Sequence, residues 1–406
     1  MQSDVPKVLH PALGLTLVEH VARAAVEVGA TKLVVVASPS NREAIAATLE
    51  PWAQAAGVDF DVAVQTEPKG TAHAVQAAEE ALADFSGNAL ILNGDVPCIS
   101  PASLQALIDA HQGGVTLLSG RMHDPFAYGR ILRKDGRLET IVEEKDADEA
   151  TKAIQEINVG VYYVDLPQAF DWLRAVQPSP TTGELYLTMI VERARAAGAA
   201  AAAVEAATPE DMLGVNTREQ LAEVIAALRA RVNRKHMLNG VTLVDPASAF
   251  IDVRAEIGRD ARIEPFVVIQ GATRIAPGAV IGPFAHVRGD SVIGAAARVG
   301  NFVEVVRSTV GPRARALHLA YVGDATVGED ANLGAGVVFA NHDGERHHAS
   351  EVGPGAALGA NTVLVGPASV GAGARTGAGA VVTQTAVPAG ETWVGAPASP
   401  ISRGVR

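Results

Sequence analysis

Residues 275–300 read IAPGAVIGPFAHVRGDSVIGAAARVG, and an aliphatic side chain returns in this stretch at every sixth position. The same spacing holds over a longer run, formed by Ile251, Ile257, Ile263, Ile269, Ile275, Ile281, Val287, Ile293, Val299 and Val305. A repeat this regular is typical of a parallel β-helix, in which each aliphatic residue points inward and stacks on its counterpart one coil away. The alternative, unrelated strands in a β-sandwich, would give drifting spacing. We therefore predict a β-helix over the C-terminal third.

The repeat is interrupted in its second half. The spacing shortens by one residue after Val305 and again after Val322. An insertion from Asn341 to Glu351 then separates the last run of anchors, which extends from Val352 to Val382. Interruptions of a stacking repeat are the places where a β-helix can carry loops and side chains that do more than pack.

The first half of the chain alternates strands with helices. Apolar runs at Leu33–Val36, Phe60–Val64 and Ala89–Leu92 predict strands, and the stretches Leu17–Val28 and Thr71–Leu82 predict helices. This alternation is typical of a mostly parallel sheet covered by helices, an α/β fold. Such sheets bind ligands beyond the carboxyl ends of their strands, and Gly94-Asp95 lies at one such end.

A helix is predicted between the two halves, from Thr217 to about Arg234. Its apolar residues recur at three and four positions, and Thr217 can cap it with Gln220 as the partner in a capping box. We interpret this helix as a stiff connector. The predicted domains are therefore residues 1–216, a linker at 217–240 and the β-helix at 241–406.

Composition narrows the range of partners. The chain has 406 residues and a formal net charge of −12, which leaves no basic surface for nucleic acid or an anionic membrane. Its one cysteine, Cys98, excludes an internal disulfide and fits a reducing compartment. We find no signal peptide and no apolar run long enough to span a bilayer, so we expect a cytoplasmic protein.

Polar residues interrupt the apolar pattern of the first half at the ends of predicted strands. These groups are Pro6–His10, Gln65 with Gly70-Thr71, Gly94–Pro97, Tyr128–Arg130, Glu143–Lys145, Glu156–Asn158 and Val215-Asn216. Asp95 is the strongest candidate for a functional residue in this half, because a carboxylate at the end of a strand can hold Mg²⁺ that bridges phosphates. Each position also has a simpler interpretation: Lys7 as a surface cation, Gly70-Thr71 as a helix start, and Asp95 as a turn former.

In the β-helix, the stretch Ala316–Asp324 places a histidine and a tyrosine where only packing residues are needed. His318 can act as a general base near neutral pH. Acetylation of an amine needs such a base, because a protonated amine cannot attack a thioester. Glu304 lies one coil earlier and is predicted to orient the His318 imidazole, although His318 could also be a structural corner residue. The insertion holds three further histidines, whose spacing matches no well-defined zinc pattern: His342, His347 and His348.

Taken in order, these groups resemble the bacterial bifunctional family that combines an N-acetylglucosamine-1-phosphate uridyltransferase with a glucosamine-1-phosphate acetyltransferase. The resemblance covers nearly the whole chain. It implies a Rossmann-like α/β nucleotidyltransferase domain followed by a left-handed β-helix of hexapeptide repeats. It also implies a two-step synthesis of UDP-N-acetylglucosamine that uses acetyl-CoA, glucosamine-1-phosphate and UTP, with Mg²⁺. The implied assembly is a homotrimer.

The resemblance assigns roles to individual residues. In the nucleotidyltransferase domain, it implies phosphate contact for Lys7, nucleotide binding for Gln65, Gly70, Thr71 and Asp95, Mg²⁺ binding for Asp95 with Asn216, and sugar binding for Gly129, Glu143 and Asn158. In the β-helix, it implies His318 as the catalytic base, sugar-phosphate contacts from Arg288, Tyr321 and Asn332, and an acetyl-CoA site at Asn341, Ala360 and Ala378.

The sequence departs from the family pattern in both halves. A strand and a Gly-rich loop that wraps the nucleotide phosphates precede Pro6–His10 in the family, whereas only the last Met of that loop is present here. In the β-helix, two family lysines are replaced by Val306 and His347, and a serine by Ala360. Two alternatives therefore stay open. Only one of the two activities survives, or the chain is a non-catalytic regulatory subunit.

Overall fold

The computed structural model describes residues 1–401, which form two compact units. The first unit comprises Met1–Ala12 and Thr16–Val224, and the second comprises Leu13–Leu15 and the chain from Ile225 on. The domain boundaries proposed from the sequence remain a prediction. Within residues 1–401, none of the helices combines the length and the apolarity that crossing a bilayer requires.

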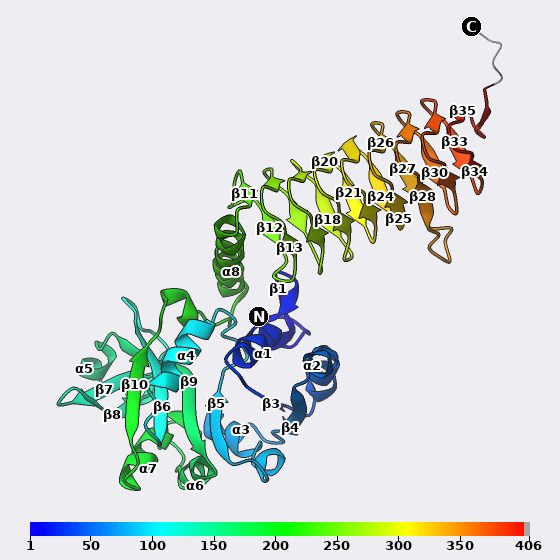
Figure 1. The fold of residues 1–406 in the computed structure, drawn as a ribbon. Coiled ribbons are helices and arrows are strands. Elements are labelled where there is room, and N and C mark those ends of the chain that lie inside the picture. Colours follow the sequence, from blue (N-terminus) through cyan, green and yellow to red (C-terminus); the bar gives the residue numbers. More distant parts are fainter. Residues whose placement is uncertain (402–406) are drawn as a thin grey trace. The chain divides into compact units, whose positions relative to one another are not determined.

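The first unit is an α/β fold with two main sheets (Figure 1). A parallel pair is formed by β3 (Lys32–Ala37) and β4 (Asp59–Val64). The larger sheet has the order β10 (Ala201–Glu205), β6 (Val115–Arg121), β9 (Glu156–Leu166), β7 (Arg130–Lys134) and β8 (Arg137–Val142), and β5 (Gly87–Ile91) also pairs with β9.

The expectation of a mostly parallel sheet is wrong in detail. The 11-residue strand β9 runs antiparallel to β5, β6 and β7, so the larger sheet is mixed. The predicted helix Thr71–Leu82 is also shorter than expected, because α3 ends at Gln76 and a 3-10 turn follows at Glu80–Leu82. The helices of this unit are α1 (Leu17–Glu27), α2 (Arg42–Ala56), α3 (Thr71–Gln76), α4 (Pro101–Asp109), α5 (Glu149–Lys152), α6 (Gln168–Arg174) and α7 (Ile190–Ala196).

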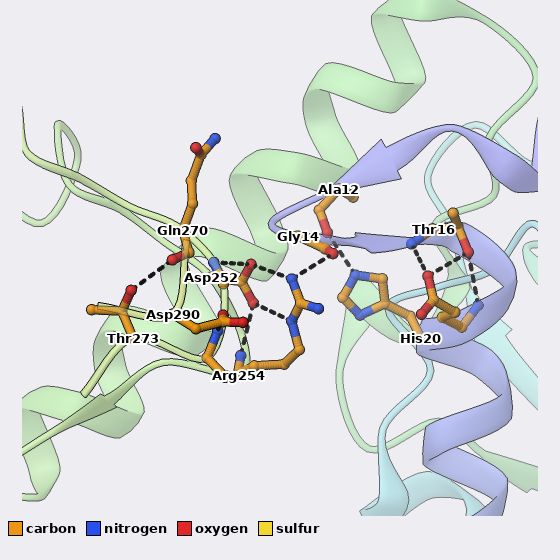
Figure 2. Close-up of polar contacts among 12 residues, drawn as sticks. Ala12, Gly14, Thr16, His20, Asp252, Arg254, Gln270, Thr273 and Asp290 are labelled. Carbon is orange, nitrogen blue, oxygen red and sulfur yellow. Dashed lines mark hydrogen bonds and ion pairs between the residues drawn. The ribbon is translucent and has the colours of Figure 1, made fainter. Parts of the chain in front are cut away.

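Local polar contacts fix the ends of two helices. Thr16 caps α1 in a capping box with Glu19, and His20 in the same helix contacts the carbonyl of Ala12 at 2.8 Å (Figure 2). The capping box predicted for the connecting helix is confirmed. In α8 (Arg218–Leu238), the Gln220 amide donates to Thr217 Oγ1, and the Thr217 amide donates to Gln220 Oε1, both at 3.1 Å.

The second unit is the predicted β-helix, built from three sheets of short strands stacked coil on coil (Figure 1). The first sheet contains β11 (Thr242–Leu243), β14 (Arg262–Ile263), β17 (Val280–Ile281), β20 (Arg298–Asn301), β23 (Arg315–His318), β26 (Asn332–Leu333), β29 (Ala357–Leu358), β32 (Arg375–Thr376), β35 (Thr392–Val394) and β36 (Ser399–Pro400). The second contains β12 (Phe250–Ile251), β15 (Val268–Ile269), β18 (His286–Arg288), β21 (Glu304–Val306), β24 (Tyr321–Gly323), β27 (Val338–Ala340), β30 (Val363–Val365) and β33 (Val381–Thr383). The third contains β13 (Glu256–Ile257), β16 (Arg274–Ile275), β19 (Val292–Ile293), β22 (Thr309–Val310), β25 (Ala325–Val327), β28 (Ser350–Val352), β31 (Ser369–Val370) and β34 (Ala386–Val387).

The aliphatic repeat forms the core of this unit, as predicted. Anchors such as Ile263, Val287 and Val305 are fully buried and belong to one continuous apolar cluster. Their counterparts one coil away are their partners in the parallel strand pairs, for example Val287 with Val305. At the first coil, the buried carboxylate of Asp252 is held by Arg254 through contacts of 2.9 and 2.8 Å (Figure 2). Inward stacking of aliphatic side chains therefore explains why the period is six and why it persists.

Candidate active sites

Three of the predicted residues in the first unit are in contact with one another through the ammonium group of Lys7. Lys7 lies in a short 3-10 helix, η1 (Lys7–Leu9), Asp95 lies in the turn after β5, and Asn216 lies just before α8. The Lys7 ammonium donates to Asp95 Oδ2 at 2.5 Å and to Asn216 Oδ1 at 2.9 Å. A positive charge therefore already sits between the two oxygens that were predicted to hold Mg²⁺. Carboxylate and amide oxygens are ligands that suit this hard cation, so the residues present fit it.

The predicted nucleotide-binding residues Gln65, Gly70 and Thr71 form one local structure. Gln65 Nε2 donates to the Gly70 carbonyl at 3.1 Å, and Thr71 Oγ1 accepts from the Leu187 amide at 2.9 Å. Gly70 has a φ of +123°, and a Cβ at this position would lie 2.4 Å from the Leu185 carbonyl oxygen. Only glycine fits here, because a side chain would meet both steric overlap and backbone strain.

The predicted sugar-binding residues also lie together. The Asn158 amide donates to the Gly129 carbonyl at 2.9 Å, and a Cβ on Gly129 would lie 3.5 Å from Glu143 Oε2. Asn158 is buried and donates from its side chain to the Tyr162 hydroxyl at 2.8 Å. Burial raises the pKa of Glu143, and the hydrogen bond from Thr188 partly opposes that rise.

Contacts outside the predicted set connect these groups. Thr188 Oγ1 donates to Glu143 Oε1 at 2.8 Å, one residue after the Leu187 amide that contacts Thr71. Tyr128 precedes Gly129, and burial raises its pKa, with a smaller contribution from the negative charge of Asp95. No local pattern in the sequence indicated that Thr188 contacts Glu143.

In the β-helix, His318 is exposed and held at one nitrogen. It lies at the end of β23, and its partner in the neighbouring coil is Asn301 at the end of β20. His318 Nδ1 lies 2.8 Å from Asn301 Oδ1. An amide oxygen only accepts, so Nδ1 is the donor, and in the neutral imidazole Nε2 then keeps its lone pair. The side chain is therefore in the tautomer that a general base requires.

The expectation that Glu304 orients His318 is not met. Glu304 lies on β21, where its strand partners are His286 and Tyr321, and Arg288 Nε donates to its carboxylate at 2.7 Å. The spacing placed Glu304 in the coil before His318 correctly, but on another sheet. The one-residue shortening after Val305 makes this coil 17 residues long, so that Asn301, rather than Gly300, lies beside the imidazole.

Tyr321 and Asn341 approach each other over Gly323. A Cβ on Gly323 would lie 2.7 Å from the Tyr321 hydroxyl and 2.6 Å from Asn341 Nδ2, so the missing side chain makes room for both. Asn341 is buried and donates to Asp324 Oδ2 at 2.5 Å. Two of the predicted sugar-phosphate and coenzyme residues are thus adjacent.

Asp324, the last residue of the stretch Ala316–Asp324, contacts several side chains, and the sequence did not indicate a role for it. Its carboxylate accepts two hydrogen bonds from Arg307, at 2.6 and 2.8 Å, and lies 3.0 Å from His347 Nδ1. Arg307 is the largest cause of the lowered pKa of Asp324. The neighbouring Val306, at the position of a family lysine, is fully buried in the coil.

The remaining predicted residues lie on the β-helix surface. Asn332 is exposed on β26, and Ala360 and Ala378 are exposed at corners of successive coils, where the Gly379 amide donates to the Ala360 carbonyl at 2.8 Å. His342 and His347 have ring centroids 4.8 Å apart, and His348 contacts Asp343 at 2.6 Å. In the described part of the chain, no three His, Cys, Asp or Glu side chains are arranged to hold a metal ion.

Comparison with known proteins identifies both halves. Residues 2–211 match the family model described as nucleotidyl transferase, and residues 254–289 match bacterial transferase hexapeptide repeats. The bifunctional protein GlmU of Exiguobacterium sp. is 39% identical, over 94% of this chain and 91% of its own length. GlmU of Geobacillus sp. is 38% identical, over 94% of this chain and 90% of its own. GlmU of Streptococcus suis is 37% identical, over 90% of this chain and 86% of its own length. The chain belongs to the family of bifunctional GlmU proteins.

Proposed function

We propose that the chain makes UDP-N-acetylglucosamine in two steps, one in each unit. The β-helix transfers the acetyl group of acetyl-CoA to the amine of glucosamine-1-phosphate. The α/β unit then couples the resulting N-acetylglucosamine-1-phosphate to UTP. The observation that carries the proposal is the hydrogen bond between His318 Nδ1 and Asn301 Oδ1, because it leaves Nε2 of an exposed histidine free to accept a proton.

In the first step, His318 Nε2 takes a proton from the sugar ammonium or from the attacking amine. The amine nitrogen forms a bond to the thioester carbonyl carbon, and the carbon–sulfur bond breaks. The thiolate of coenzyme A leaves and is protonated. Arg288, Tyr321 and Asn332 would hold the sugar phosphate, and Asn341, Ala360 and Ala378 would line the coenzyme site. The Arg288–Glu304 ion pair keeps that guanidinium at the surface of the coil.

In the second step, a phosphate oxygen of the sugar attacks the α-phosphorus of UTP and pyrophosphate leaves. Gln65, Gly70 and Thr71 would bind the nucleotide, and Gly129, Glu143 and Asn158 would bind the sugar. Asp95 and Asn216 would hold Mg²⁺, which neutralises phosphate charge when bound. Lys7 would contact the phosphates, so that its ammonium exchanges the two side-chain oxygens for phosphate oxygens. Positioning and charge neutralisation account for most of the rate in phosphoryl transfer.

The test measures consumption of acetyl-CoA with glucosamine-1-phosphate as acceptor. We expect His318→Ala to lower kcat by about 10²–10⁴-fold, the usual contribution of a general base. We expect Asn301→Ala to lower kcat by about tenfold and to change its pH profile, because the imidazole loses its fixed tautomer.

A control histidine and a second assay keep the two activities apart. His123→Ala changes an exposed histidine in the first unit and should leave acetyl transfer unchanged. Pyrophosphate release from UTP and N-acetylglucosamine-1-phosphate should be unaffected by His318→Ala and lost with Asp95→Ala. Equal acetyl transfer by wild type and His318→Ala would exclude His318 as the base. Activity in only one of the two assays would favour a monofunctional enzyme.

A homotrimer is the assembly we propose for these reactions. Phe266, Phe284 and Phe302 stack on the outside of successive coils, with ring centroids 4.8 and 5.1 Å apart. They are 55%, 47% and 55% exposed. Three exposed aromatic rings in a row are more apolar surface than a lone β-helix needs. If neighbouring β-helices pack on this ladder of rings, a second copy of the chain lies close to His318.

A further inference from the structure

A small polar cavity lies in the first unit where two neighbouring parallel strands, β6 and β10, end. It has a volume of about 280 Å³ and is lined by Ser119, Gly120, Arg121, Arg133, Glu156, Ala203 and Glu205. These residues come from four consecutive strands of the larger sheet, β10, β6, β9 and β7 (Figure 1). None of them belongs to the proposed nucleotide, sugar or Mg²⁺ sites. The carboxyl ends of parallel strands are where open α/β sheets bind ligands, so we examined this strand-end cavity as a binding site.

The wall of the strand-end cavity is built by polar side chains on one face of the sheet. Glu205 is the strand partner of Ser119, and Glu156 is the strand partner of Arg121. Because residues two apart along a strand point to the same face, all four side chains share that face. Ser119 is 2% exposed and donates to the Val204 carbonyl at 3.3 Å, so its oxygen can still accept a hydrogen bond. The wall therefore offers charges of both signs and a buried hydroxyl group.

Two of the four charges in the wall neutralise each other. Arg133 donates to both carboxylate oxygens of Glu156, at 2.9 and 2.6 Å. Arg133 is the largest cause of the lowered pKa of Glu156, and the charge of Arg121 lowers that pKa further. A bidentate pair of this kind has a fixed geometry and no net charge, so it favours neither an anionic nor a cationic ligand.

The other two charges, those of Arg121 and Glu205, have no partner. Within residues 1–401, neither side chain forms a hydrogen bond or an ion pair, and both residues are exposed. Arg121 lies two residues beyond the strand partner of Glu205, which puts the two Cα atoms about 8 Å apart. A ligand that meets both residues must carry a negative group for the guanidinium and a positive group for the carboxylate. A dianion would be repelled by Glu205, and a dication by Arg121.

We propose that the strand-end cavity binds a small zwitterionic α-amino acid. Its carboxylate accepts hydrogen bonds from the Arg121 guanidinium, a geometry that suits a planar fork of donors. Its ammonium group donates to the Glu205 carboxylate, and Ser119 Oγ accepts from a polar group of the ligand. The proposal is independent of the two reactions proposed for the chain.

The test measures heat of binding when the full chain is titrated with L-serine. We expect one site per chain with a Kd of about 1 mM or tighter. Glycerate replaces the ammonium group by a hydroxyl group, and ethanolamine lacks the carboxylate. Each should bind at least about tenfold more weakly than L-serine, because one charged hydrogen bond is lost. L-Asparagine and L-glutamine carry the same two charges on larger molecules and show whether size limits binding.

Variants of the two unpaired residues place the ligand in the cavity. Arg121→Gln should weaken binding of L-serine at least about tenfold and abolish its advantage over ethanolamine. Glu205→Gln should weaken binding by a similar factor and abolish the advantage over glycerate. The matched controls are Arg137→Gln and Glu149→Gln, at exposed residues of the same unit that do not line the cavity. Binding of ethanolamine or glycerate as tight as that of L-serine, unchanged binding in either cavity variant, or no binding of any of the three amino acids would overturn the proposal.

Discussion

At the scale of single residues, the sugar-binding role proposed for Glu143 conflicts with the stability of the fold. Burial is the main cause of its raised pKa, and the carboxylates of Asp146 and Glu184 raise it further. A carboxyl group with a raised pKa in the folded state stabilises the fold below its unfolded pKa of about 4.3, and this contribution is lost as the pH rises through the folded value. At neutral pH, the raised pKa of Glu143 therefore lowers the stability of the fold.

Glu143→Gln removes the charge and keeps an oxygen that can accept the hydrogen bond from Thr188. We expect Tm at pH 7 to rise by about 2 °C, with the difference from wild type shrinking as the pH falls toward 4. If Glu143 binds the sugar, KM for N-acetylglucosamine-1-phosphate should rise by about tenfold, as expected for a lost charged hydrogen bond. Calorimetry at several pH values and a pyrophosphate-release assay measure the two effects. Glu149→Gln, with a 93% exposed side chain, is the control. A lower Tm at pH 7 would contradict the argument.

The sequence motifs indicated which residues belong to one site. They did not indicate which side chains form hydrogen bonds with one another. Lys7, Asp95 and Asn216 lie far apart in the chain, and the family resemblance implied phosphate and Mg²⁺ roles for them; in the structure their side chains are in contact. The contact between His318 and Asn301 spans 17 residues, and it depends on where the six-residue spacing shortens. A shift of one residue decides which side chain meets the imidazole, and only the strand pairing reveals it.

At the scale of elements, the insertion after β27 is tied to the coil by one carboxylate. Asp324 contacts Arg307, His347 and Asn341, of which the last two belong to the insertion. Its lowered pKa means that this stabilisation is present above the unfolded pKa of about 3.9 and is lost as the pH falls through the folded value. The insertion is thus held by ion pairing as well as by backbone contacts.

Asp324→Asn keeps the shape of the side chain and removes its charge. We expect hydrogen exchange in residues 341–350 to become about tenfold faster, because the bidentate pair with Arg307 is weakened. Exchange in the buried strands β21 and β30 should be unchanged. Arg313, which pairs with Asp330 at an exposed corner, offers the matched control Asp330→Asn. Equal exchange in the variant and wild type would show that backbone contacts alone hold the insertion.

The repeat predicted the β-helix well because one physical cause, inward stacking, acts on every coil. The first unit offered no such repetition. Its short apolar runs marked β3, β4 and β5. However, β9 pairs antiparallel with β5, β6 and β7, which precede it at different distances along the chain. Strand order of this kind depends on long-range packing, so the sequence predicted the elements and missed their mixed arrangement.

At the scale of the whole molecule, the exposed phenylalanine ladder carries the last prediction. Phe266, Phe284 and Phe302 occupy one corner of three coils with φ near +55° to +60°, and the exposed Leu319 occupies that corner in the next coil. His318 directly precedes Leu319. An interface that covers the ladder would therefore reach the proposed base, so assembly and acetyl transfer should be lost together.

Light scattering after size-exclusion chromatography should give wild type a mass three times the 41.8 kDa of one chain. The triple change Phe266→Ser, Phe284→Ser and Phe302→Ser removes the aromatic surface without touching the buried anchors, and we expect it to yield a monomer. Its acetyl transfer should fall by at least about 100-fold if a second copy completes the site, while uridylyl transfer stays within about twofold. Phe126→Ser, at a 72% exposed ring in the first unit, should change neither mass nor activity. A triple variant that stays trimeric would place the interface elsewhere, and a monomer with full acetyl transfer would show that one β-helix suffices for catalysis.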